Sequence, residues 1–192
     1  MDDLEFTIRR MGWERNKKTL PVPARVDEAS LGQARELQIT GKYEAALEFL
    51  SQVKECVEDP RCLRLVGLCH LGLGKLDEAI ELFVLSRECS RSELARDEVN
   101  LCMALLSAKR FTEAIAAAER AVDLAPSDVG PHINMVSALR RANEDLQLDS
   151  YLRELRENFP EIVQSPVFQE RLRHDPDFIG IASRLEKLGT PK

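Results

Sequence analysis

The chain has few aromatic residues and no long apolar stretch. Aromatic side chains make up 5% of its 192 residues, and there is a single Trp. A membrane-spanning helix needs roughly 18 or more consecutive apolar residues, and none of the apolar runs is that long. The first residues also lack the basic and then apolar pattern of a signal peptide. We therefore expect a cytoplasmic protein without a membrane span.

The sequence also has no excess of basic residues. Its formal net charge is −6 and its pI is near 5.3. Affinity for nucleic acids comes from clustered Lys and Arg that neutralise phosphates, and the longest basic cluster, Arg15 to Lys18, is short and interrupted by Asn16. The composition therefore excludes a general nucleic-acid binder.

Residues with the spacing of a catalytic or metal site are missing as well. The five cysteines form an odd set within predicted helices, which is typical of reduced thiols rather than of a disulfide framework. The three histidines show no zinc-ligand spacing, and no nucleophile motif or Gly-rich phosphate loop occurs. We expect no metal, no cofactor and no enzymatic activity.

What the chain does have is a repeat. The segment Gly74–Phe83 has counterparts at Gly41–Leu50 and Lys109–Ala118. The alanines that anchor the three segments, Ala46, Ala79 and Ala114, are 33 and 35 residues apart. A period near 34 is typical of stacked helical hairpins. The pattern resembles the tetratricopeptide repeat (TPR) family, in which each repeat is two antiparallel helices.

This resemblance predicts an all-α, right-handed superhelical solenoid with C-terminal capping helices. Gly67 supplies the small residue where two helices of a repeat cross, and Gly41 and Gly74 make tight turns. We expect four hairpins, at residues 27–59, 60–93, 94–128 and 129–160. Such an array must cover the apolar face of its last repeat.

The two ends of the chain stand outside the hairpins. Residues 161–192 contain two helix starts, Ser165-Pro166 and Asp175-Pro176, and the large apolar residues Phe168, Phe178 and Ile179, so we interpret them as the cap. Residues 1–25 form an N-terminal arm with a Pro-containing linker. This arm is either loosely ordered or docks through its apolar residues on the array or on a partner.

The first helices of the hairpins carry the candidate binding residues, because in the family these helices line the inner surface. Their inward positions hold six arginines and one acid, although the whole chain has more acids than bases. Arginine can hold a carboxylate in two hydrogen bonds, which favours an acidic ligand. Asn100 and Asn134 occupy the same position in successive repeats and resemble the asparagine ladder of some family members. The predicted partner-binding residues are Arg61, Arg64, Leu68, Arg96, Asn100, Met103, Asn134 and Arg140.

These features predict a protein–protein interaction module of the adaptor, scaffold or co-chaperone type. It would bind an acidic and apolar segment of a partner in a concave groove. The alternative for the arginines is that they pair with acids on neighbouring helices. Two other functions remain open: a self-assembling homo-oligomeric subunit that uses its N-terminal arm, and a small secretion-type chaperone. The carboxylate clamp of the family matches at only two of its five places, Arg64 and Asn100.

Overall fold

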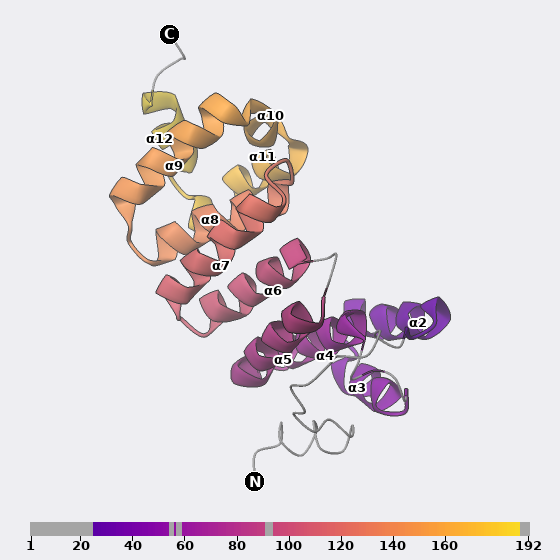
Figure 1. Cartoon of the computed structure of the whole chain (residues 1–192). Coiled ribbons are helices and arrows are strands. Elements are labelled where there is room, and N and C mark those ends of the chain that lie inside the picture. The colour runs from indigo at the N-terminus through magenta and orange to yellow at the C-terminus, as the bar shows by residue number, and fades with distance from the viewer. Residues whose placement is uncertain (1–24, 54–55, 57–58, 91–93, 189–192) are drawn as a thin grey trace. The chain divides into compact units, whose positions relative to one another are not determined.

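The structure, a computed structural model, describes residues 25–53, 56, 59–90 and 94–188. Every secondary-structure element in these ranges is a helix, and most helices alternate with short turns (Figure 1). The fold is therefore all-α and built from helical hairpins, as predicted. Most of the predicted N-terminal arm, residues 1–24, lies outside the described residues.

The chain forms two compact units, Met1–Ala104 and Leu105–Lys192, where the sequence suggested one array. The boundary falls inside helix α6. The first unit contains α2 (Glu28–Ile39), α3 (Tyr43–Ser51), α4 (Pro60–Gly72), α5 (Leu76–Cys89) and most of α6 (Leu94–Ser107). The second contains α7 (Phe111–Leu124), α8 (Val129–Arg141), α9 (Asp145–Asn158), α10 (Pro160–Gln164), α11 (Pro166–His174), the short 3₁₀ helix η1 (Pro176–Phe178) and α12 (Ile181–Lys187).

The first helix of each hairpin ends in the same way. Residues with positive φ follow α2, α4, α6 and α8: they are Gly41, Gly74, Lys109 and Asn143. Behind each of them the next backbone N–H donates to a carbonyl five residues back, for example from Lys75 to His70 at 2.9 Å. This is the Schellman cap, which satisfies carbonyl groups at a helix end and favours glycine. The repeat is therefore visible in backbone geometry as well as in sequence.

Small residues allow the two helices of a hairpin to cross closely. The anchoring alanines Ala46, Ala79 and Ala114 are fully buried. A Cβ atom added to Gly67 on α4 would lie 2.7 Å from the ring of Phe83 on α5, a side chain that is itself fully buried. The α4–α5 hairpin therefore depends on the absence of a side chain at Gly67.

The C-terminal helices pack on the last hairpin of the second unit. Helices α11 and η1 contact α8, while α10 and α12 contact α9. Phe168 and Phe178 are fully buried, with their rings edge to face at a centroid distance of 5.5 Å. The sequence also counts Ile179 among the large apolar residues of the cap, but its side chain is 69% exposed. Helix η1 ends at Phe178, and the chain then turns through Gly180 in the left-handed conformation.

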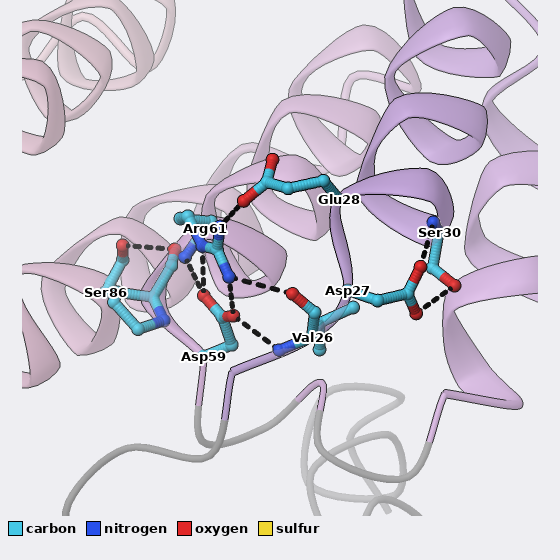
Figure 2. A network of polar contacts seen from close by, with 8 residues as sticks. Val26, Asp27, Glu28, Ser30, Asp59, Arg61 and Ser86 are labelled. Carbon is cyan, nitrogen blue, oxygen red and sulfur yellow. Dashed lines mark hydrogen bonds and ion pairs between the residues drawn. The ribbon is translucent and has the colours of Figure 1, made fainter.

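A buried carboxylate joins the first hairpin to the second (Figure 2). Asp59, the N-cap of α4, accepts hydrogen bonds from the backbone N–H of Val26 at 2.9 Å and from the Nε and Nη2 atoms of Arg61 at 3.0 and 2.7 Å. Arg61 in turn donates to the carbonyl oxygen of Val26 at 2.9 Å and pairs with the carboxylate of Glu28. The start of α2 is thereby tied to the start of α4.

These bonds also set the ionisation of Asp59. Burial alone opposes its charged form, but the hydrogen bonds from Arg61 and Val26 and the charge of Arg61 outweigh burial, so the pKa of Asp59 lies below its ordinary 3.8. A carboxyl group with a lowered pKa in the folded state stabilises the fold above its unfolded pKa. That contribution is lost as the pH falls through the folded pKa.

We predict that Gly67→Ala lowers the stability of the protein, whereas Gly32→Ala raises it. Both glycines lie within helices, where alanine is preferred by roughly 0.5–1 kcal/mol. At Gly32 an added Cβ meets nothing within 4 Å, but at Gly67 it collides with Phe83, and overpacking of this kind costs about 1–3 kcal/mol. Thermal unfolding of the two variants checks this; a melting temperature that rises equally in both would contradict the described crossing.

We predict that Asp59→Asn destabilises the protein by about 1–3 kcal/mol near neutral pH, because Arg61 and the N–H of Val26 lose a charged acceptor. The difference from the wild type should shrink as the pH falls from about 4, where the unfolded carboxyl group takes up a proton, through the lower pKa of the folded state. Urea unfolding at several pH values measures this difference in the free energy of unfolding. Glu28→Gln is the control: its side chain is 82% exposed, so little change is expected. A difference that stays constant from neutral to acidic pH would contradict the role assigned to Asp59.

Candidate functional site

A second buried carboxylate joins α4, α5 and α6 within the first unit. Asp97 on α6 is fully buried, and its Oδ1 atom accepts from Nε of Arg64 and from Oγ of Ser86, each at 2.8 Å. Its Oδ2 atom accepts from Oγ of Ser90 at 2.7 Å. The side chain of Asp97 therefore contacts both helices of the second hairpin, α4 and α5, and the C-cap residue of α5.

The next residue is buried in the same way. Glu98 is 3% exposed and pairs with Arg87 of α5 at 3.3 Å. Both acids of α6 thus point into the unit and neutralise arginines there. Helix α4 contains no acidic residue at all. Consequently, neither α4 nor the part of α6 in this unit exposes a carboxylate.

Two of the predicted partner-binding arginines are engaged inside the unit. Arg64 is 9% exposed and bonded to Asp97, and Arg61 is bonded to Asp59 and Glu28. For these two residues the structure shows the alternative that the sequence left open, pairing with acids of the same chain. Their guanidinium groups are held by internal acceptors, and we do not count them among the candidate contacts.

The other predicted residues of the first unit lie at its surface. Arg96 is exposed, Met103 is 41% exposed, and Leu68 and Asn100 are half-buried. The bond between Arg64 and Asp97 joins α4 and α6. Each of the four residues lies on the same helix as one of these two and within about two helical turns of it. We call Leu68, Arg96, Asn100 and Met103 the α4–α6 surface. It offers a cation, an amide and two apolar side chains.

The remaining predicted residues, Asn134 and Arg140, lie on α8 in the second unit. Asn134 is 9% exposed, so little of its amide reaches the surface. The side chain of Arg140 is 37% exposed, with Nη1 3.8 Å from the carboxylate of Asp145. Their role in partner binding stays a prediction. Helix α8, like α4, contains no acidic residue.

The thiols have surroundings that suit the reduced form. All five cysteines are free, and four of them are buried. Burial raises the pKa of Cys69 to about 11. A hydrogen bond with Cys56, together with burial, raises the pKa of Cys62 well above its ordinary value. High thiol pKa values disfavour the reactive thiolate, and among the described residues no group of three or more His, Cys, Asp or Glu is placed to bind a metal ion.

One histidine has a clear structural role. His132, which is 1% exposed, donates from Nε2 to the carbonyl oxygen of Pro126 at 2.7 Å, so its Nδ1 accepts from the hydroxyl of Tyr151 at 2.6 Å. Burial, followed by the charge of Glu154, raises the pKa of Tyr151. These bonds join α8, α9 and the turn before α8, and they serve packing within the second unit. None of the helices in the described ranges is long and apolar enough to cross a membrane.

Sequence reasoning missed the buried acids. It assigned no acid to the interior, but Asp59, Asp97 and Glu98 are 1%, 0% and 3% exposed. The one signal for these contacts in the sequence is the spacing of the partner residues. Asp97 lies 33 residues after Arg64, and Asp59 lies 33 residues after Val26, so each contact joins equivalent parts of neighbouring repeats.

Two family models match parts of the chain. The family model described as "Anaphase-promoting complex, cyclosome, subunit 3" matches residues 23–84, and the model described as "Tetratricopeptide repeat" matches residues 99–128. A search of curated proteins found no match.

A solved structure has a similar fold. The crystal structure of YrrB, described as a TPR protein with an unusual peptide-binding site, aligns with a TM-score of 0.57 at 13% identity. The alignment covers 97% of this chain and 92% of that one. Together with the repeated hairpins, these matches support the tetratricopeptide repeat family, whose repeats in general form protein–protein interaction modules.

Proposed function

We propose that this protein binds an acidic and apolar segment of a partner protein through the α4–α6 surface. In this proposal Arg96 binds a carboxylate of the segment, Asn100 hydrogen bonds to its backbone, and Leu68 and Met103 contact its apolar side chains. The protein would then act as an adaptor, scaffold or co-chaperone, and its ligand would be a polypeptide.

The distribution of charge is the observation that carries this proposal. The chain has a net charge of −6, and each of the second helices α3, α5, α7 and α9 contains more acids than bases. On α4 and α6, by contrast, the only acids are Asp97 and Glu98, and both are buried against arginines. A segment rich in carboxylates would be repelled by the second helices, whereas the described residues of α4 and α6 expose no carboxylate to it.

The apolar and amide groups add the remaining contacts. Met103 is a large hydrophobic side chain with 41% of its surface exposed, and its flexible thioether adapts to different apolar partners. An amide such as that of Asn100 can donate to and accept from a peptide backbone at once. The proposal does not use Asn134 and Arg140 on α8, whose role in partner binding stays a prediction.

We predict that Arg96→Glu weakens peptide binding about 10- to 100-fold, equivalent to about 1.4–2.8 kcal/mol, because a charge-assisted contact is replaced by repulsion. Random peptides displayed on phage are first selected on the immobilised full chain. The peptides recovered should combine Asp or Glu with large apolar residues. Their affinities for the wild type and the variant are then measured by fluorescence anisotropy.

The control is Arg153→Glu, which makes the same change of charge at an exposed position of the second helix α9. It should leave the affinity nearly unchanged. Met103→Glu tests the apolar contact separately, and circular dichroism shows whether each variant keeps its helices. Selected peptides without acidic residues, or equal affinities of the Arg96 and Arg153 variants, would overturn the proposal.

A further inference from the structure

Two of the buried thiols lie in direct contact. Cys56, between α3 and α4, and Cys62, in the first turn of α4, are 1% and 0% exposed, and a hydrogen bond joins their side chains. We infer that this pair is a redox site, at which a peroxide oxidises the two thiols to a reversible disulfide that fastens Cys56 to the start of α4. The inference is independent of the proposed function, because neither residue belongs to the α4–α6 surface.

The hydrogen bond gives the two sulfur atoms different roles. It raises the pKa of Cys62, and burial and the charge of Asp59 act in the same direction, while the charge of Arg61 opposes them. A hydrogen bond that raises the pKa favours the protonated form, so the Cys62 sulfur keeps its proton and donates to Cys56. Both thiols therefore stay reduced without an oxidant, and a thiolate formed at Cys56 faces an S–H donor.

The oxidation proceeds in two steps with hydrogen peroxide as the oxidant. The Cys56 thiolate attacks one peroxide oxygen, the O–O bond breaks, and the sulfur becomes a sulfenic acid as hydroxide leaves. The Cys62 sulfur then attacks the Cys56 sulfur, the S–O bond breaks, and the S–S bond forms. The two thiol protons convert the departing oxygens to two waters, and the two electrons lost by the sulfurs reduce the peroxide. Because the sulfurs already lie in contact, the second step needs no encounter between molecules.

The position of Cys56 distinguishes this pair from the other buried thiols. Cys56 lies between two helices, where its backbone N–H donates to the carbonyl oxygen of Val53 at 3.1 Å. A local opening at Cys56 therefore admits a small oxidant without unwinding a helix. Cys69, by contrast, lies inside α4, and burial raises its pKa to about 11. Cys69 is thus a buried thiol of the same helix that can serve as a comparison.

The disulfide would act at the joint between the first two hairpins. Asp59 lies between the two cysteines in the sequence, and its carboxylate accepts from the backbone N–H of Val26. Its carbonyl oxygen accepts from the N–H of Cys62 at 3.0 Å. A bond between Cys56 and Cys62 closes a short loop around Asp59, which reduces the conformational entropy of the unfolded chain. Oxidation therefore stabilises the attachment of α2 to α4.

Peptide mapping of the oxidised full chain tests the inference without any variant. The reduced protein is treated with a several-fold molar excess of hydrogen peroxide, unfolded, labelled with N-ethylmaleimide and digested with trypsin. We expect a protein of monomeric mass with two fewer labels than the untreated chain, in which peptide 55–61 is linked to peptide 62–64. Dithiothreitol should restore both labels. A full set of labels, a disulfide between other cysteines, a linked dimer, or oxygen added to Cys56 without a link would overturn the inference.

Thermal unfolding measures the effect of the disulfide on the joint. The oxidised wild type should melt about 5 °C above the reduced wild type, since closure of a short loop stabilises the fold. Cys62→Ala should lose both the link and this shift, whereas Cys69→Ala, which removes a fully buried thiol of the same helix, should keep both. An oxidised wild type that melts at or below the temperature of the reduced protein, or an equal shift in Cys62→Ala, would contradict the fastening of the joint.

Discussion

The burial of Asp97 is the interaction on which the rest of the first unit depends. A carboxylate in an apolar interior is costly unless it is paired with an opposite charge and accepts hydrogen bonds. Here Arg64, Ser86 and Ser90 supply those donors from two helices and a helix end. The same bonds fix α6 beside α4 and α5. Asp59 does the equivalent task one repeat earlier, so both joints between hairpins in the first unit contain a buried acid.

These joints also decide the charge of the surface beside them. Because Asp97 and Glu98 are buried, Arg96 is the exposed charged residue among those of α6, Leu94–Ser107. The second helices α3, α5, α7 and α9 together hold 13 acids and 4 arginines. The structural role of two buried carboxylates and the proposed binding of an external carboxylate therefore have one origin, the burial of the acids of α6.

Much of the fold follows from the sequence, and less of the site does. The repeated alanines and the turn residues predict the hairpins because they reflect local geometry, and the predicted turns at Gly41 and Gly74 follow α2 and α4. The pairing of Arg64 with Asp97 could not be predicted in this way. A buried acid and a solvent-facing acid have the same helical spacing, and only the contact between repeats distinguishes them. Ile179 is a second example. The sequence counts it among the apolar residues of the cap, but the 3₁₀ helix η1 ends just before it and its side chain is exposed.

The most direct test of the account is an NMR titration of protein carrying ¹³C-labelled methionine methyl groups. Met103 is 41% exposed on the α4–α6 surface, whereas Met135 on α8 is 8% exposed and serves as an internal reference. A saturating phage-selected peptide should shift the Met103 methyl resonance strongly and leave that of Met135 nearly unchanged. A Met103 resonance that stays in place while the peptide is bound would contradict binding at this surface.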